Sequence, residues 1–380
     1  MLIKERLLTP GPTPIPEEVS ATSSRPIVHH RSPEFSKIFM EVIQGLKYIY
    51  RTAQDVFVLL SSGTGAMEKA LVNILCPGDK IITINAGKFG ARWGQIGRSF
   101  GVEVKDIVLD WGENYTKEQL AQELKANPDT AAVFTTLSET STGTIYDIKG
   151  YADVLSQTDA VLVVDGISGI GAMPCPMDDW NIDVLISASQ KFFMTPPGLA
   201  YISFSPKAWS LVEKSTLPKY YFDAKKAKAS MGKHTTPFTP GISLLMQQRT
   251  ALDMIERFGL NELFQHHRIL GDAVRAGVKA AGLELLSKNP GNILTAVNIP
   301  PGIDGNRFVK IMQQKYHVYI SGAQEPHAGE FFRISHLGYV DGFDIVTVLC
   351  AMEMAFSELG YIIKSGTSVA AAQNILKENW

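Results

Sequence analysis

The chain has 380 residues, of which 45% are hydrophobic and 19% are charged, and its 36 basic residues nearly balance its 38 acidic ones. This length predicts roughly two or three domains, and the low share of charged residues allows a large buried core. The balanced charge argues against binding to nucleic acid or to an anionic membrane, because both depend on a surplus of basic residues.

The start of the chain and the cysteines bear on the compartment. The segment "MLIKERLLTPGPTP" reaches proline before an apolar stretch long enough for a signal peptide can form. No apolar run approaches the ~18 residues that a membrane helix needs. Cys76, Cys175 and Cys350 are scattered and odd in number, which indicates free thiols. We therefore expect a cytoplasmic protein with no membrane and no nucleic-acid partner.

The first two thirds of the chain follow an alternating pattern. Residues 1–16 are rich in proline and predict an extended arm. Residues 32–52 have helical spacing, with Ser32 as N-cap and Pro33 in the first turn. Apolar runs then alternate with helical patterns: "DVFVLL", "DKIITI", "EVKDIVL", "TAAVFTTL", "AVLVVD", "DVLISAS" and "LAYISF". This predicts an α/β fold with a mostly parallel sheet whose strands are covered on both faces.

The pattern changes after about residue 255, inside a long helix, to that of a smaller α+β domain. The helices predicted there are "ISLLMQQRTALDMIERFG", "NELFQHHRILGDAVRAGVKAAG" and, last, "DIVTVLCAMEMAFSEL". The strands are "ILTAVNIP", "VYISGA" and "FFRISHL". We therefore divide the chain into an N-terminal arm (1–16), a large domain (17–255) and a small C-terminal domain (256–380).

The carboxyl ends of the predicted strands are the places to search for a site, because open parallel sheets bind ligands there. After "DVFVLL" comes "SSGTGAMEKAL", in which glycines lead into a helix whose N-terminal amides suit a phosphate. An ordinary strand–helix turn with a hydroxyl cap is the alternative. A dinucleotide-binding loop is disfavoured, because the next strand ends in Asn85 and Ala86 rather than in an acid.

Two further groups end neighbouring apolar runs. Asp165 follows "AVLVV", and Lys191 follows "DVLISASQ". Taken singly, Asp165 suits a helix cap or an ion pair, and Lys191 suits a side chain that extends to the surface. "GISGI" after Asp165 lacks the final glycine of a nucleophile elbow. Together, a phosphate seat, a carboxylate and a lysine predict pyridoxal 5′-phosphate (PLP) as cofactor, with a desolvated Lys191 forming its Schiff base.

At this point the chain resembles a known family over nearly its whole length. The motifs are "LLTPGPTP", "SSGTGAME", "AGKFGARW", "ETSTG", "VVDGISG", "SASQKFFMTPPG", "TTPFTPGISL" and "FRISHLG", in this order. They resemble the class V, fold-type I PLP-dependent aminotransferases of the alanine–glyoxylate and serine–pyruvate kind. The resemblance implies a seven-stranded, mostly parallel sheet and a smaller C-terminal α+β domain. It also implies transamination between alanine or serine and glyoxylate or pyruvate.

The resemblance implies contacts to the phosphate and to the two faces of the ring. Thr64, Gly65 and Ala66 would bind the phosphate, mainly through the backbone, because some relatives have a histidine in place of Ala66. Phe89, which is tryptophan in many relatives, would stack on one face of the ring. Ile167 would cover the other face. The alternative for Phe89 is an ordinary core aromatic.

Further roles around the ring follow in the same way. Asp165 would pair with the pyridine nitrogen, and Ser141 or Thr142 would lie beside the ring, unless their hydroxyls only cap a turn. Gln190 would contact the phosphate or the ring hydroxyl. Lys191 would carry the Schiff base and then act as general base at the substrate Cα.

The resemblance also implies a substrate group and a second subunit. Arg333 in "FFRISHLG" would bind the substrate carboxylate, for which a guanidinium is well suited. Thr236, or else Thr239, in "HTTPFTP" would reach the phosphate in the neighbouring subunit, although Lys233 replaces a tyrosine of some relatives. Gly11 in the arm would contact substrate in the other subunit's site. The active protein would then be a homodimer with shared sites.

Several alternatives remain open. An aminotransferase of the same fold acting on aspartate, 2-aminoethylphosphonate or phosphoserine would need a further cation, such as Arg25 or Arg31. A cysteine desulfurase is disfavoured, because "SGAQEPHAGEF" ahead of the arginine has no cysteine. A non-catalytic subunit that retains the fold belongs to another class. The histidine pairs 29–30 and 266–267 predict no metal site, because adjacent side chains diverge on a helix and no further ligands are suitably spaced.

Overall fold

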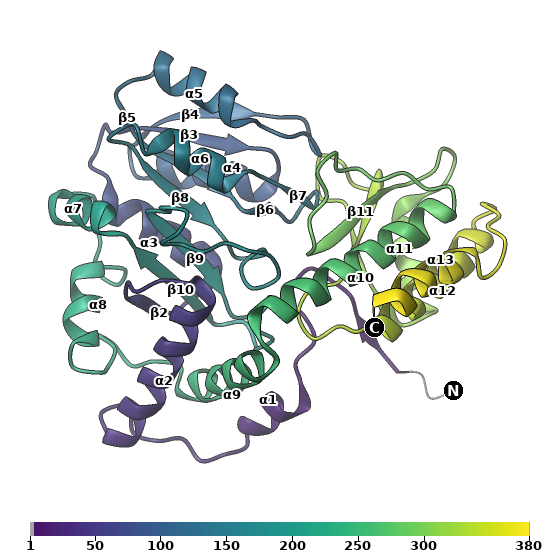
Figure 1. Ribbon diagram of the computed structural model, residues 1–380, viewed down its shortest axis with the longest axis horizontal. Helices are drawn as coiled ribbons and strands as arrows, with labels where there is room; N and C mark the ends of the chain where they lie inside the picture. Colours follow the sequence, from purple (N-terminus) through teal and green to yellow (C-terminus); the bar gives the residue numbers. More distant parts are fainter. Residues whose placement is uncertain (1–3, 380) are drawn as a thin grey trace.

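A seven-stranded sheet lies at the centre of the large domain in the computed structural model, which describes residues 4–379 (Figure 1). Its spatial order is β2–β10–β9–β8–β5–β3–β4. The strands are β2 (Val56–Leu60), β3 (Lys80–Asn85), β4 (Glu103–Val108), β5 (Thr130–Thr136), β8 (Val161–Asp165), β9 (Val184–Ala188) and β10 (Leu199–Phe204). β10 is antiparallel to β2 and β9, and the other neighbours are parallel. The predicted mostly parallel sheet is therefore confirmed, and the seven apolar runs are its strands.

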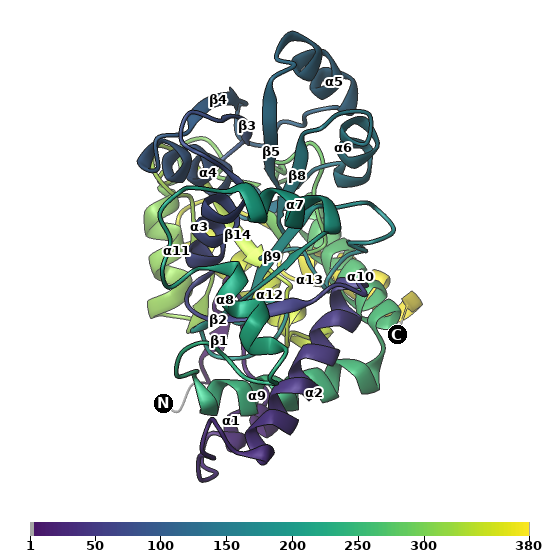
Figure 2. The ribbon, with the colours of Figure 1, turned by 90° about the vertical axis from the view of Figure 1, so that its left-hand side faces the viewer.

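Helices cover both faces of this sheet, as the alternating pattern predicts. Figure 2 shows α3 and α4 on one side of the strands and α6 on the other. The predicted cap of α2 is present, because the Ser32 side chain accepts a hydrogen bond from the Phe35 amide at 3.2 Å. The helices are α1 (Glu17–Thr22), α2 (Pro33–Tyr50), α3 (Gly63–Ile74), α4 (Lys88–Ser99), α5 (Lys117–Ala126), α6 (Ile148–Leu155), α7 (Pro206–Lys214), α8 (Ala224–Met231) and α9 (Ile242–Phe258).

β4 departs from the expectation that every strand is covered on both faces. It pairs only with β3 at the edge of the sheet, and Glu103, Lys105 and Val108 are exposed. The run "EVKDIVL" alternates charged and apolar residues, which is typical of a strand with one solvated face. The two-sided burial predicted for this strand is therefore wrong.

The small domain contains an antiparallel sheet in the order β11–β14–β13. Its elements are α10 (Leu260–Ala280), β11 (Leu294–Asn298), α11 (Gly305–Gln314), β12 (Val318–Tyr319), β13 (Ser321–Gly322), β14 (Phe331–Ser335), α12 (Gly342–Glu358) and α13 (Thr367–Asn379). The prediction of a smaller α+β domain is confirmed. However, α12 is not the last helix: α13 follows it and packs on α10 and α12. The predicted strand "VYISGA" is divided into β12 and β13.

Two separate hydrophobic cores define the domains. The core around the large sheet includes Ile255 in α9 and Leu260 at the start of α10. The core of the small domain begins with Leu270 along α10 and includes Phe332 from β14. One helix, α10, thus contributes to both cores and connects the two parts of the chain (Figure 1).

The N-terminal arm packs on the small domain of its own chain. β1 (Arg6–Leu7) pairs in parallel with β12, and Leu8 is buried in the small-domain core. The Leu8 carbonyl also accepts a hydrogen bond from the Ser335 amide at 2.9 Å. The first three residues of the predicted arm lie outside the described part of the chain. Among the helices of residues 4–379, none has the length and apolarity that crossing a membrane requires.

Candidate active site

Asp165 and Lys191 lie at the carboxyl ends of two neighbouring parallel strands. Asp165 is the last residue of β8, and Lys191 follows β9, which pairs with β8. Both side chains are buried, and burial raises the pKa of Asp165 to about 7 and lowers the pKa of Lys191 to about 8. The charge of each group opposes the shift of the other. An amine with this pKa is partly neutral near pH 7 and can act as a nucleophile or a base.

The arm covers this lysine. The Lys191 ammonium donates a hydrogen bond to the Pro10 carbonyl, and the Thr13 hydroxyl donates to the Lys191 carbonyl at 2.8 Å. At Gly11, which has φ +146°, a Cβ would lie 2.6 Å from Lys191 Cε and 2.7 Å from its Nζ. Only glycine allows the arm to approach so closely. Gly11 thus lies against the site of its own chain, and its contact with a second subunit stays a prediction.

The first turn of α3 has the features of a phosphate seat. Ser62 at its N-cap makes no side-chain hydrogen bond to the helix within residues 4–379, and Thr64 and Gly65 lie in the first turn, followed by the buried Ala66. Arg92 on α4 donates a hydrogen bond to the Thr64 hydroxyl at 3.1 Å. A helix N-terminus and a guanidinium both favour a bound phosphate. Arg92 is a residue that the sequence reasoning missed, although it stands within the motif "AGKFGARW".

Contacts connect the residues predicted around the ring, on α4 and at the end of β8, with the start of α3. Phe89 lies in the first turn of α4, with the Arg92 guanidinium 4.9 Å from its ring centre. The Ile167 amide donates to Asp165 Oδ1 at 2.8 Å, and the Ile167 side chain reaches Gly63 at the start of α3. The carboxylate, the aromatic ring and the phosphate seat are thereby linked by direct contacts.

An unpartnered acceptor supports a bound group at this place. The buried Oε1 of Gln190 has no hydrogen-bond partner in the described part of the chain. Leaving such an atom unsatisfied costs about 1–3 kcal/mol, which a ligand hydroxyl would remove. Together with the Asp165 carboxylate, the Lys191 amine and the seat at Thr64, this acceptor fits the polar groups of PLP. The residues present therefore suit the predicted cofactor.

Ser141 and Thr142 use their hydroxyls within the chain. They lie between β6 (Ser138–Glu139) and β7 (Thr144–Ile145), which form a short antiparallel pair. Ser141 donates to Glu139 Oε1 at 2.6 Å, and Thr142 donates to the Thr144 hydroxyl at 3.0 Å. Glu139 is fully buried and was missed as a site residue. Its signal was present in the sequence, because it follows an apolar strand as Asp165 does.

Arg333 brings a second cation from the small domain. It lies in β14, is 6% exposed, and donates to the Thr140 carbonyl at 3.0 Å and the Gly322 carbonyl at 2.7 Å. Its Nε has no partner among residues 4–379. Burial lowers the pKa of Arg333 to about 10, while the Glu139 charge opposes that shift. A buried guanidinium with a free donor suits the carboxylate of a substrate.

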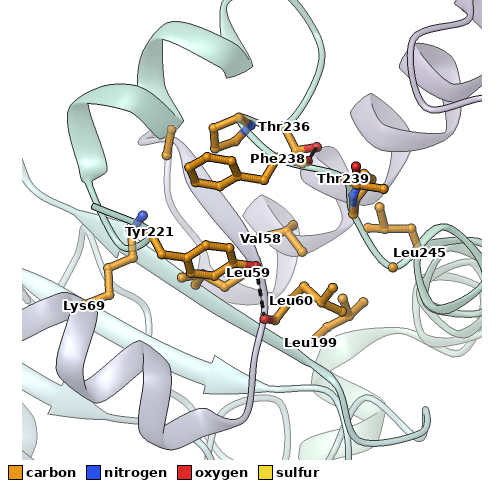
Figure 3. A pocket seen from close by; sticks show the side chains of 14 residues that line it. Val58, Leu59, Leu60, Lys69, Leu199, Tyr221, Thr236, Phe238, Thr239 and Leu245 are labelled. Atoms are coloured by element: carbon orange, nitrogen blue, oxygen red, sulfur yellow. Dashed lines mark hydrogen bonds between the residues drawn. The ribbon is translucent and has the colours of Figure 1, made fainter. Parts of the chain in front are cut away.

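The loop that carries Thr236 and Thr239 lines a separate pocket beside β2 and α3 (Figure 3). The buried Thr236 donates to the Phe238 carbonyl at 2.7 Å, whereas Thr239 is exposed. Lys69 and Tyr221 line the same pocket. Within the described residues, Asp165, Lys191 and Arg333 are not part of its lining. The structure of one chain therefore does not bring this loop to the other predicted site residues.

Comparison with known proteins adds three findings. A family model described as Aminotransferase class-V matches residues 14–324. The chain is 38% identical over 379 residues to a protein of Synechococcus sp. (strain PCC 6716) described as a soluble hydrogenase small subunit, covering 98% of each. It is 34% identical over 381 residues to an L-aspartate–glyoxylate aminotransferase of Paracoccus denitrificans, covering 98% of this chain and 96% of that one. The crystal structure of a ureidoglycine–glyoxylate aminotransferase from Bacillus subtilis superposes with a TM-score of 0.95 at 25% identity, covering 99% of both.

Proposed function

Because this chain belongs to the class V aminotransferase family, whose members depend on PLP, we propose that it transfers an amino group from alanine or serine to glyoxylate or pyruvate. The observation that carries this proposal is the burial of Asp165, Lys191 and Arg333 around one site. An acid, an amine and a carboxylate-binding guanidinium are the three side chains that transamination needs. The proposal of small substrates is supported by the relatives, several of which are described as glyoxylate aminotransferases.

Each of these residues has a defined task. Bound PLP supplies an aldehyde that condenses with amines and a ring that accepts electron density from the substrate Cα. Arg333 binds the carboxylate of the amino acid through its free donor. Lys191 takes the proton from Cα, because with a pKa of about 8 roughly a tenth of the amine is neutral at pH 7. Asp165 holds a proton on the ring nitrogen, and that positive charge in turn favours its ionised form.

The arm contributes by excluding water. Pro10 and Gly11 lie directly on the Lys191 side chain, so the amine is removed from solvent without a lid having to close. A dry site strengthens every charge interaction within it. This contact supports a role for the arm in keeping the lysine amine partly neutral.

The experiment is a panel of amino acids added to the purified, cofactor-loaded protein. Alanine, serine, aspartate and phosphoserine are compared by the change in visible absorbance of the bound cofactor and by the 2-oxo acid released. We expect alanine or serine to react fastest, and Lys191→Ala to lose nearly all turnover. A wild-type protein that binds PLP but leaves every amino acid unchanged would refute the proposal.

Two other candidates have specific observations in their favour. Aspartate as amino donor is favoured by the Paracoccus relative, and the same panel tests it. A non-catalytic subunit is favoured by the relatives described as soluble hydrogenase subunits. That role predicts no change in absorbance with any amino acid, although Asp165, Lys191 and Arg333 are all present.

We further propose a homodimer in which Thr239, rather than Thr236, reaches the neighbouring phosphate. Thr239 is exposed, whereas Thr236 is buried and donates its hydroxyl to Phe238, which supports Thr239. In a mixed dimer of Lys191→Ala and Thr239→Ala subunits, one site keeps both residues and regains activity. Light scattering establishes the dimer, and a Thr236→Ala mixture that behaves identically would contradict the assignment.

We also propose that the protein works in the cytoplasm. Its three cysteines are free, which supports a reducing compartment. Cell fractionation followed by immunodetection tests this location.

A further inference from the structure

The Glu139 carboxylate is a buried charge that the proposed chemistry does not use. Glu139 is the last residue of β6 and has no exposed surface. Its Oε2 accepts hydrogen bonds from the amides of Gly90 at 2.8 Å and Phe89 at 3.1 Å. Its Oε1 accepts from the Ser141 amide at 3.0 Å and the Ser141 hydroxyl at 2.6 Å. Four donors therefore compensate for the burial of this ion.

These four bonds join two elements that carry predicted ring contacts. Phe89 and Gly90 form the first turn of α4, whose N-cap, Gly87, gives no side-chain cap within residues 4–379. The Glu139 carboxylate, from β6, takes the place of this cap at the N-terminus of α4, where the helix dipole favours a negative charge. A Cβ at Gly87 would lie 2.7 Å from the Glu139 carboxyl carbon, so glycine at this position allows the carboxylate to approach the start of α4. The backbone at Phe89 and Gly90 is thus tied to Ser141 through one side chain.

The same carboxylate acts electrostatically on all three groups assigned to the reaction. Its negative charge raises the pKa of Lys191 and of Arg333, in each case against the effect of burial, and it also raises the pKa of Asp165. Other charges act on the same groups. Lys191 and Arg92 lower the pKa of Asp165. Asp165 raises the pKa of Lys191, and Arg333 lowers it. The site therefore contains three cations, which Asp165 alone does not balance.

We propose that Glu139 is a positioning residue of the active site. Its carboxylate holds Phe89 and Ser141 together by hydrogen bonds, and it supplies the second negative charge that balances Lys191 and Arg333. This inference rests on the proposed aminotransferase function. Glu139 acts through its neighbours, since its carboxylate accepts hydrogen bonds from Phe89, Gly90 and Ser141. Its effect must therefore be visible in the protonation of the site as well as in turnover.

The test compares Glu139→Gln and Glu139→Asp with a matched control, Glu353→Gln. Glu353 on α12 is also buried and accepts two backbone hydrogen bonds, from Gly366 at 2.7 Å and Ser368 at 2.5 Å, but it lies in the small domain. The first measurement is a pH titration of the visible absorbance of the PLP-loaded protein. The second is thermal unfolding, and the third is steady-state kinetics.

The expected results separate charge from structure. Removing the Glu139 charge destabilises the protonated form of the neighbouring cations, so Glu139→Gln moves the titration midpoint to lower pH by roughly 0.5 to 1 unit. It also lowers kcat by about tenfold. KM for the amino acid stays equal or falls, because Arg333 loses an opposing charge. Glu353→Gln lowers the unfolding temperature only, and Glu139→Asp keeps the wild-type midpoint but unfolds at lower temperature because its reach is one methylene shorter.

Two outcomes overturn the inference. One is a folded Glu139→Gln protein with the wild-type midpoint. The other, which decides the matter even if the glutamine variant does not fold, is a Glu139→Asp protein with wild-type thermal stability. A failure of the proposed function itself is distinguishable, because then the wild-type protein would show no amino-group transfer at all.

Discussion

Lys69 offers a quantitative test of how burial is balanced in this fold. It lies on α3, where Figure 3 shows it beside the pocket, and is 2% exposed. Its ammonium is 5.8 Å from the centre of the Phe57 ring. Burial lowers its pKa from 10.5 to about 8, and the charge of Asp223 only partly opposes this. Methionine has a similar length and no charge, so Lys69→Met removes the cost of the buried ammonium while keeping its packing.

The magnitude follows from the size of the shift. A change from 10.5 to about 8 corresponds to ~3 kcal/mol at about 1.4 kcal/mol per unit. The lost interaction with Phe57 offsets ~1 kcal/mol, which leaves a gain of about 2 kcal/mol for the variant. Because the folded pKa is the lower one, the cost in wild type is fully present below pH 8. The cost falls as the pH rises from about 8 through 10.5, and it vanishes only above 10.5, where neither state binds the proton.

The assay is urea unfolding of wild type, Lys69→Met and the control Lys125→Met at pH 7 and at pH 10. Lys125 is an exposed lysine on α5, so its replacement should leave the free energy of unfolding unchanged. We expect Lys69→Met to be more stable than wild type at pH 7 and nearly equal to it at pH 10. A variant that is less stable at pH 7, or one with the same gain at both pH values, would refute the reasoning.

Three further predictions concern the site. Arg333→Gln should raise KM for the amino acid by about 100-fold with a smaller change in kcat, because a charge-assisted carboxylate contact of ~3 kcal/mol is lost; an unchanged KM would exclude Arg333 as the carboxylate group. Gly11→Ala should lower the unfolding temperature and slow PLP uptake measured by absorbance, since its Cβ would lie 2.6 Å from Lys191 Cε; wild-type uptake would show that the arm moves freely. Asp165→Asn should lower kcat by at least ~100-fold and shift the alkaline limb of the absorbance titration to lower pH, because the Asp165 charge raises the pKa of Lys191; a shift to higher pH would contradict this.

Periodicity was sufficient to predict the large sheet and the meeting of Asp165 with Lys191. Runs of five or more apolar residues are strong signals, and parallel neighbours place their carboxyl ends at one edge. The edge position of β4 was harder to predict, because it depends on strand order, which is set by contacts far apart in sequence. α13 was missed because "TSVAAAQNILKEN" has mostly small or polar side chains. Its apolar face consists of the buried Ala372 and Leu376 and the partly buried Val369 and Ile375.

The missed site residues have a similar explanation. Glu139 comes three residues after the end of β5, whereas Asp165 is the last residue of β8, so the rule that located Asp165 was not applied to Glu139. Arg92 lies on the surface of a helix pattern, where an arginine is ordinarily solvated. Arg92 reaches the proposed phosphate seat only because the first turns of α4 lie beside Thr64 on α3. Both residues are defined by contacts between elements, which a single sequence does not specify.

The pairing of β1 with β12 makes the arm a mechanical linkage between the two domains. The chain is anchored at Leu8 in the small-domain core, and two residues later the Pro10 carbonyl holds the Lys191 ammonium of the large domain. So short a tether has almost no slack, since each residue spans at most ~3.6 Å. A rotation of the small domain would therefore displace the Pro10 carbonyl from the Lys191 ammonium. Movement of the domain and loss of this hydrogen bond are thus coupled.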